Sequence, residues 1–346
     1  MRILAWLQRK KILGRLISVV AVLVFILYLL WAHDLLRVEL FEYTERALTE
    51  NWKALLLSTS LLATPLTLAA VGECINERAG LFNIGLEGIF FLSVVIGVRG
   101  AEIIGSGVAG LLVGLLTGAL IGFIFSVLAV YLRANQLVLG MGINIFAMGM
   151  LAYLLATIWA FPGIHSVRPE FHIPKMLGFF TPVFFVAVIA AILAHILIHR
   201  TLFGIRIRAA GEKPEAVDVA GVRVDRIRIL ACTVGAALAG LGGAFFALGW
   251  FGEIVKEMAV GMGFIALAVV VVAGLEPLLA LAIAFVFGFV RALADWVATM
   301  PGINAVLPGA FYIMNMVPFL VTLLVVVIFI GRMRFPRALG KPYMRE

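Results

Sequence analysis

Polar side chains are concentrated in residues 73–88, a segment with apolar runs on both sides. The charged and amide side chains that could meet a solute here are Glu73, Glu77, Arg78, Asn83 and Glu87. A charge at membrane depth costs several kcal/mol unless it is paired or lines a water-filled cavity. Gly80, Gly85 and Gly88 would let a helix break in this segment and leave backbone groups facing such a cavity. Many transporters bind their cargo at broken helices near the membrane midplane, so the segment is a candidate substrate site.

The same segment also fits a short cytoplasmic loop. In that interpretation Glu77 and Arg78 form a local ion pair at the surface and have no part in transport. Composition does not separate the two interpretations, so whether residues 73–88 lie in mid-membrane or in a loop stays open at this point.

Residues 211–221 have the pattern of a short amphipathic helix inside the most basic loop. Lys213 precedes a proline and is therefore biased away from helix, whereas Pro214 suits the first helical position. Ala216, Val219 and Ala220 then share one apolar face, and a glycine is placed to end the helix. The residues concerned are Gly211, Glu212, Pro214, Glu215, Ala216, Val219, Ala220 and Gly221. Since two turns are marginally stable alone, the helix should need a partner surface, either a separate cytoplasmic protein or the chain's own cytoplasmic face.

Other regularities indicate packing more than chemistry. Two stripes of small residues recur every four positions, and they are Gly110, Gly114, Gly118 and Gly122 in one apolar run and Ala236, Gly240 and Ala244 in another. In lipid this spacing lets a neighbouring backbone approach closely, and the alternative is a substrate-lining groove. Arg291 and Asp295 lie four apart and are expected to pair across a helical turn in a structural role.

Motifs of enzymes are absent from the sequence. It contains no Gly-x-x-x-x-Gly-Lys-Ser/Thr, no His-Glu-x-x-His and no nucleophile elbow. The five histidines (33, 165, 172, 195 and 199) are interpreted as showing no ligand spacing, so no metal or other cofactor is predicted. The chain is therefore not expected to be an enzyme, and any ATP hydrolysis would occur on a separate subunit.

Composition sets the class of protein. Of 346 residues, 64% are hydrophobic and 13% charged, and the mean hydropathy is +1.14, far above that of soluble domains. The net charge of +8 does not indicate a nucleic-acid partner, because the basic residues lie mostly in loops between apolar runs. Cys74 and Cys232 are far apart and fit neither a zinc site nor a disulfide framework. The sequence predicts an all-α integral membrane protein that contacts lipid and no nucleic acid.

About ten transmembrane helices are expected, in a single transmembrane domain over residues 1–346. The apolar runs are 13–32, 54–72, 84–98, 107–131, 136–158, 183–198, 229–250, 262–275, 278–297 and 313–330. Residues 1–53 would form an N-terminal helix and an extracytoplasmic loop, and residues 199–228 a cytoplasmic loop. The short runs 84–98 and 262–275 could each be half of a broken helix.

Charge predicts the orientation of these helices. The N-terminus, the loop 199–228 and the C-terminal tail are basic, whereas the loop 33–53 is net acidic. By the positive-inside rule both termini and the loop 199–228 lie in the cytoplasm. Tryptophans agree, because the span ends placed outside carry Trp31, Trp52, Trp159, Trp250 and Trp296.

These segments resemble a known family. Residues 77–88, Glu-Arg-Ala-Gly-Leu-Phe-Asn-Ile-Gly-Leu-Glu-Gly, are similar to the ERAG-x-x-NIG-x-EG signature of ABC importer permease subunits, in the nucleoside/simple-sugar branch of the family for ribose, nucleosides and branched-chain amino acids. Residues 211–221 resemble its G-x-x-P-x-A…AG cytoplasmic segment, and 236–244 and 261–268 match the stretches that follow. The similarity covers about residues 55–330, and it departs locally at Gly274-Leu-Glu-Pro277, where relatives carry a more polar turn.

The resemblance implies a type II-like permease in the bacterial cytoplasmic (inner) membrane. It implies a second permease chain, paralogous or identical, a cytoplasmic ABC ATPase, and an extracytoplasmic substrate-binding lipoprotein. Residues 214–220 become the coupling helix that sits in a groove of the ATPase, with 211–221 as the coupling segment. The substrate pathway is expected to include Glu77, Arg78, Phe82, Asn83, Glu87 and Asn144.

The leading hypothesis for the cargo is a nucleoside or purine-like compound. Phe82, Phe90, Phe91 and Phe146 are candidates for stacking on a base, with Glu87 and Asn144 as hydrogen-bonding partners. Alternative cargoes are a ribose-type simple sugar and a flavin-type vitamin. A secondary transporter that uses Glu87 and Asp295 for ion coupling, and a passive channel or scaffold, are further alternatives. The discriminating feature is the segment 211–221, which an ion-coupled carrier has no reason to build.

Overall fold

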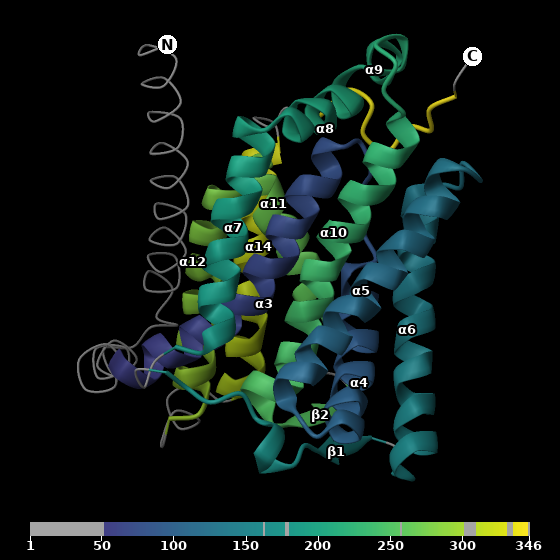
Figure 1. The fold of residues 1–346 in the computed structure, drawn as a ribbon. Coiled ribbons are helices and arrows are strands. Elements are labelled where there is room, and N and C mark those ends of the chain that lie inside the picture. Colours follow the sequence, from purple (N-terminus) through teal and green to yellow (C-terminus); the bar gives the residue numbers. More distant parts are fainter. Residues whose placement is uncertain are drawn as a thin grey trace.

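The computed structural model describes residues 52–161, 163–176, 180–256, 258–300, 309–330 and 335–344. Over these residues the chain is a bundle of long helices that run up and down between two ends (Figure 1). One end carries the short helices α8 (Leu202–Glu212) and α9 (Pro214–Val219) and is termed the α8–α9 face. The other carries a small sheet of two strands, β1 (Ile164–Ser166) and β2 (Glu253–Val255), and is termed the β1–β2 face. The predicted first helix, 13–32, which includes Trp31, and residues 33–51 of the predicted loop 33–53 lie outside the described residues.

The helices follow the predicted apolar runs closely. They are α3 (Trp52–Arg78), α4 (Leu86–Ile104), α5 (Gly107–Val130), α6 (Gln136–Trp159), α7 (Pro182–Arg200), α8 (Leu202–Glu212), α9 (Pro214–Val219), α10 (Val224–Phe245) with the π-helical turn η2 (Phe246–Phe251), α11 (Met262–Ala273), α12 (Pro277–Ala298) and α14 (Ala310–Ile330). A 3-10 turn, η1 (Pro169–Phe171), lies near β1 (Ile164–Ser166), which pairs antiparallel with β2 (Glu253–Val255). Each of the nine runs predicted between residues 54 and 330 is a helix.

Not all of these helices cross the bundle. Among the described residues six are long and apolar enough to span a membrane: α3, α5, α6, α7, α10 with η2, and α12. Helix α11 has 12 residues, which is about 18 Å of helix and too short for a hydrocarbon core of about 30 Å. The expectation of a half-helix at 262–275 is therefore confirmed for α11. Helix α4 has 19 residues and starts inside the bundle, as described below.

The two predicted stripes of small residues face each other, where α5 crosses α10. A Cβ built on Gly118 would lie 2.2 Å from the carbonyl oxygen of Ala236. One built on Gly240 would lie 2.4 Å from the carbonyl oxygen of Gly114. The backbones touch, so the stripes form internal packing, and the groove alternative is wrong for these positions.

Gly118→Ala should therefore destabilise the protein, by about 1–3 kcal/mol, because the added methyl group meets backbone that cannot move aside. The matched control is Gly142→Ala in α6, where a Cβ meets nothing within 4 Å and alanine is the better helix former. Thermal unfolding of the detergent-solubilised variants measures the difference. Equal melting temperatures for the two variants would contradict the close approach of α5 and α10.

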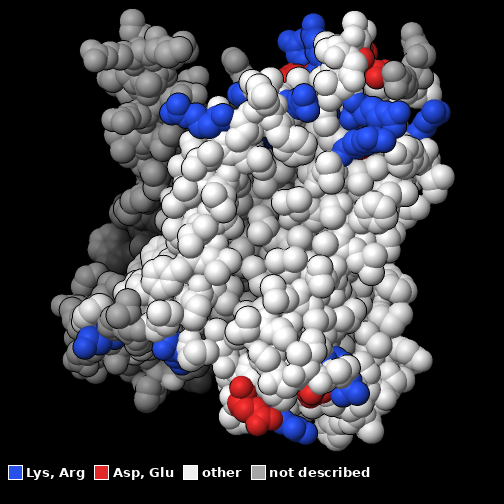
Figure 2. Space-filling model, viewed as in Figure 1, with Lys and Arg blue, Asp and Glu red and all other residues white. Residues whose placement is uncertain are grey.

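The two ends of the bundle differ in charge (Figure 2). Lys and Arg form a band over the α8–α9 face, while the opposite end has both signs and the space between carries few charges. Exposed residues of the basic face include Arg206, Lys213, Arg223 and Arg226. The C-terminal residues 335–344 lie on the same face, where the Ala338 N–H donates to the Gly211 carbonyl, 2.9 Å. This asymmetry is the one that the positive-inside rule describes.

Candidate functional site

The break predicted in residues 73–88 is present, but it begins later than the apolar run suggests. Helix α3 continues to Arg78, six residues beyond the predicted end. Glu73, Asn76 and Glu77 are buried within its last turns. Residues 79–85 then leave the helix, and α4 begins at Leu86. Helix α3 ends beside α8 at the α8–α9 face, and the chain then turns back into the bundle (Figure 1).

Hydrogen bonds to side chains hold the break in place. The Asn83 N–H donates to Glu73 Oε1, 2.8 Å, and the Asn76 amide donates to both oxygens of the same carboxylate, 3.1 Å each. The Phe82 N–H donates to Gln136 Oε1, 2.7 Å, at the start of α6. These bonds satisfy backbone groups that a broken helix leaves free. The carboxylate oxygens of Glu77 are buried without a hydrogen-bond partner among the described residues.

Asn144 fixes the first turn of α4 against α6. Its amide oxygen accepts the Gly88 N–H, 2.8 Å, and its amide nitrogen donates to the Ile84 carbonyl, 3.0 Å. Asn144 is eight residues into α6, which places the start of α4 about 12 Å along that helix. Helix α4 therefore begins at depth.

Glu87 lies where two helices begin. It is in the first turn of α4, and its Oε2 accepts the N–H of Gly261, the residue before α11, at 3.0 Å. The two helices approach so closely that a Cβ on Gly263 would lie 2.5 Å from the Glu87 nitrogen. Helix N-termini carry partial positive charge, so the 8% exposed Glu87 carboxylate lies at two electropositive ends. This is the geometry of discontinuous helices in transporters.

Arg78 does not pair with Glu77, so the local ion pair of the loop interpretation is wrong. Its Nη2 is 2.5 Å from Glu276 Oε1, and its Nε donates to the Leu275 carbonyl, 2.9 Å. Arg78 thus joins the end of α3 to the turn between α11 and α12. Glu276 is the residue before α12 in the turn 274–276, where the resemblance departs from the family pattern.

The aromatic candidates lie in different environments. Phe90 and Phe91 are buried in the core, and Phe90 meets Phe246 edge to face, with ring centroids 5.3 Å apart. Phe146 is 58% exposed on α6, and Phe82 in the break is half-buried. Among the four, Phe82 is the one that combines a position in the break with partial exposure.

The segment 211–221 folds as predicted. Lys213 is non-helical, with φ −146° and ψ 82°, and Pro214 is the first residue of α9. Gly221 has φ +78°, and its N–H donates to the Asp218 carbonyl, 2.8 Å. Pro214 starts the helix because its φ is already fixed, and glycine ends it because a left-handed residue is costly with a side chain.

One face of α9 packs against the rest of the chain, and the other is exposed. Pro214 and Val217 are buried against the rest of the chain. Ala216, Val219 and Ala220, the predicted apolar face, are exposed, and Val219 is 91% exposed. The helix is anchored on its own chain while its predicted contact face points outward.

Arg228 in α10 connects this segment to the broken helix. Its guanidinium is 2% exposed, and it donates to the carbonyls of Ala79, Ala210 and Lys341 at 3.2, 3.4 and 3.0 Å. These carbonyls belong to the break, to α8 and to the C-terminal tail. Tyr343 of the same tail contacts Asp218 of α9, with its hydroxyl 3.1 Å from a carboxylate oxygen. Sequence analysis singled out none of these bonds, because they join residues far apart in the chain.

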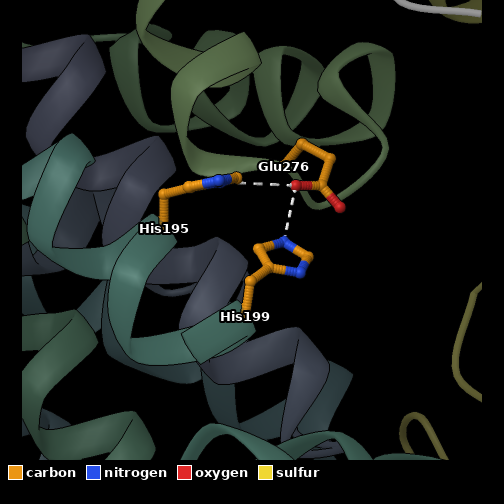
Figure 3. Close-up of side chains that lie close together, drawn as sticks. All are labelled: His195, His199 and Glu276. Carbon is orange, nitrogen blue, oxygen red and sulfur yellow. Dashed lines mark hydrogen bonds and ion pairs between the residues drawn. The ribbon is translucent and has the colours of Figure 1, made fainter. Parts of the chain in front are cut away.

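The interpretation that the histidines show no ligand spacing is wrong for one pair. His195 and His199 are four apart on α7 and face Glu276 together (Figure 3). Burial raises the pKa of Glu276, but the hydrogen bond from His199 and the charge of Arg78 outweigh it, so the pKa lies below its usual value. The i, i+4 spacing on an apolar helix was the available signal, whereas Glu276 is supplied only by the tertiary fold.

The predicted ion pair between Arg291 and Asp295 is present, with the two groups 3.0 Å apart. Arg291 also donates a hydrogen bond to Asn315 of α14, 3.1 Å.

Comparison with known proteins places the chain in a family. The family model described as "Branched-chain amino acid transport system / permease component" matches residues 55–334. The chain is 32% identical over 307 residues to the guanosine ABC transporter permease protein NupQ of Bacillus subtilis, covering 83% of this chain and 95% of that one. No solved structure matches it at a significant level.

Two further relatives bear on the cargo. The nucleoside ABC transporter permease protein NupC of Lactococcus lactis is 33% identical over 307 residues, with the same shares covered. A putative glucose ABC transporter permease protein of Haloferax volcanii, TsgC13, is 32% identical over 250 residues, 69% of this chain and 76% of that one. The match to the sugar permease is therefore the less extensive.

Proposed function

Because the chain belongs to the family of ABC transporter permease components and is a multi-pass membrane protein, we propose that it forms part of the translocation pathway for a nucleoside or a purine-like solute. The observation that carries the choice of solute is the similarity to NupQ and NupC over 83% of the chain. A simple sugar is the second candidate, favoured by the similarity to TsgC13. An ion-coupled carrier is not favoured, because it would not need the exposed face of α9.

The proposed pathway runs beside the broken helix. The two helix N-termini at Glu87 offer partial positive charge and backbone N–H groups to a polar solute. Asn144 and Asn83 bond to the break itself, so their proposed role is to position the backbone there. Phe82, half-buried in the break, is the aromatic side chain proposed to meet a base. Glu77 lies in the last turn of α3, and its buried carboxylate has no hydrogen-bond partner among the described residues. Arg78, the last residue of α3, holds this end of the helix to Glu276.

The proposed coupling helix is α9, and residues 211–221 form the coupling segment that contains it. Its bare apolar face would sit in a groove of a separate cytoplasmic ATPase, which hydrolyses ATP. Closure of the ATPase would push on α9, and Arg228 would pass this displacement to the break and to α8. The α8–α9 face is then cytoplasmic, in agreement with its charge (Figure 2), and both chain termini are proposed to be cytoplasmic.

The proposed assembly contains a second permease chain and an extracytoplasmic binding lipoprotein. Helix α6 is mostly exposed along its length and has large apolar side chains outward, among them Met141, Ile145 and Met148. Such a face suits lipid or another permease helix. The mixed-charge β1–β2 face is where the binding protein would deliver the solute.

ATP-driven uptake tests the proposal. The permease, a partner permease, the ATPase and the binding protein are reconstituted in proteoliposomes, and uptake of radiolabelled guanosine is measured with and without internal ATP. Uptake should require ATP and should be competed by excess unlabelled nucleosides but not by ribose, glucose or riboflavin. The control is the same assembly with an ATPase whose nucleotide site is inactivated.

Two outcomes would overturn parts of this assignment. Uptake that persists with the inactive ATPase contradicts an ATP-driven importer. ATP-dependent uptake that ribose or glucose competes, and nucleosides do not, replaces the nucleoside by the sugar.

A further inference from the structure

His195, His199 and Glu276 converge on one point at the α8–α9 end of the bundle (Figure 3). The two imidazoles come from successive turns of α7, and the carboxylate comes from the residue that precedes α12. One ligand atom from each residue lies within 4.8 Å of the other two. All three side chains are partly buried, with exposed fractions of 37%, 23% and 27%.

The distances in this cluster leave one buried imidazole nitrogen without a hydrogen bond. His199 Nε2 is 2.8 Å from Glu276 Oε2 and forms a hydrogen bond there. His195 Nδ1 is 3.8 Å from the same oxygen, which is too far for a hydrogen bond. This nitrogen has no hydrogen-bond partner among the described residues. Two ligands of a tetrahedral zinc ion lie about 3.4 Å apart, given bonds of about 2.0–2.1 Å. In the structure the two imidazole nitrogens lie 2.8 and 3.8 Å from Glu276 Oε2, on either side of that separation.

The surroundings of Glu276 are those of a metal-binding carboxylate. Arg78 Nη2 holds the other oxygen, Oε1, at 2.5 Å. Carboxylates that bind metals are usually held in this way by an outer hydrogen-bond donor, which leaves one oxygen directed at the ion. The positive charge of Arg78 lowers the affinity of the site without occupying its ligand atoms.

From this geometry we propose that His195 Nδ1, His199 Nε2 and Glu276 Oε2 bind a divalent transition metal, represented by Zn²⁺. Imidazole with one carboxylate favours zinc over magnesium and calcium, which prefer oxygen ligands. Three protein ligands leave a fourth position for water. The site is independent of the transported solute, so it goes beyond the proposed function.

The position of the site gives it a structural consequence. Helix α8 follows α7 directly, because Thr201 is both the C-cap of α7 and the N-cap of α8. A metal ion bound here joins the end of α7, from which the coupling segment continues, to the turn between α11 and α12. Arg78 extends the connection to the end of α3.

Zinc binding to the full chain in lipid nanodiscs tests the site, with a purification tag that contains no histidine. Competition with a metallochromic indicator should give one Zn²⁺ per chain. His195→Ala and His199→Gln should each weaken binding by roughly 100-fold, since losing a ligand costs at least as much as the 10–100-fold loss for an outer partner. Glutamine at position 199 can still donate a hydrogen bond to Glu276, so this variant should fold normally.

The matched control is His165→Gln. His165 is also 2.8 Å from a carboxylate, Glu102, but it lies on the other face and belongs to no group of three potential metal ligands among the described residues. Zinc should raise the melting temperature of the unchanged chain and of His165→Gln, and should leave that of His195→Ala unchanged. Absence of binding, or binding that survives both His195→Ala and His199→Gln, would overturn the proposal.

Discussion

Gly221→Val is expected to lower ATP-driven uptake by roughly 5- to 30-fold while the chain still inserts and assembles. Gly221 ends α9 with φ +78°, and a branched residue in this conformation costs roughly 1–2 kcal/mol. A Cβ there meets nothing within 4 Å, so the cost comes from the backbone and not from a clash. The strain is relieved by reorienting the end of α9, which moves the exposed side chain of Val219.

The size of the effect follows from this strain, because a change of 1.4 kcal/mol is about tenfold in rate. Uptake and the stimulation of ATPase activity are measured in the same proteoliposomes.

Gly105→Val separates this effect from general destabilisation. Gly105 caps α4 with φ +79°, and a Cβ there also meets nothing within 4 Å. Its backbone strain is therefore the same, but it lies at the opposite face, and uptake should fall little. Gly221→Asn should restore part of the activity, because asparagine tolerates the left-handed conformation. Unchanged uptake and unchanged ATPase stimulation in Gly221→Val would count against α9 as the coupling helix.

Arg228→Leu is expected to have the largest effect on stability. The substitution leaves three carbonyls without their donor, those of Ala79, Ala210 and Lys341. Ala79 and Ala210 are buried, whereas Lys341 is exposed to water. A buried acceptor left unsatisfied costs about 1–3 kcal/mol, so the two buried carbonyls together should cost about 2–6 kcal/mol. The break, α8 and the C-terminal tail would then separate locally. Size-exclusion chromatography and thermal unfolding in detergent would show less folded protein and a lower melting temperature.

Arg226→Leu is the matched control for charge and composition. Arg226 lies two residues earlier in the same helix and is exposed, so its loss removes the same charge with little effect on stability. Arg228→Lys should remain destabilised, because one ammonium group cannot reproduce the fork of donors. Equal melting temperatures for Arg228→Leu and Arg226→Leu would show that the buried guanidinium does not hold this face together.

Local patterns predicted the fold well because they depend on neighbours in sequence. The nine apolar runs between residues 54 and 330 are helices, since about 20 apolar residues bury their backbone groups only in that form. Pro214 and Gly221 start and end α9 through their own backbone preferences. The half-helix α11 followed from its length alone.

Local sequence patterns could not predict the contacts between segments that are distant in the chain. Arg78 has an acidic neighbour in Glu77, yet it pairs with Glu276, 198 positions away. Glu276 was interpreted as a detail of a loop, and His195 and His199 as unrelated histidines, because the carboxylate that joins them arrives from α12. The extent of α3 was also underestimated, because its polar last turns are buried by neighbouring helices.

The sequence by itself determined that this chain is a helical membrane protein, where its apolar helices lie, and which short segment between them is an amphipathic helix. The tertiary structure alone decided that α4 and α11 begin beside each other at Glu87, that Arg228 joins three separate segments, and that two histidines share a carboxylate. The reason is physical. Backbone preference and apolar periodicity act over a few residues, whereas a buried charge takes the partner that packing brings within reach, wherever that partner lies in the chain.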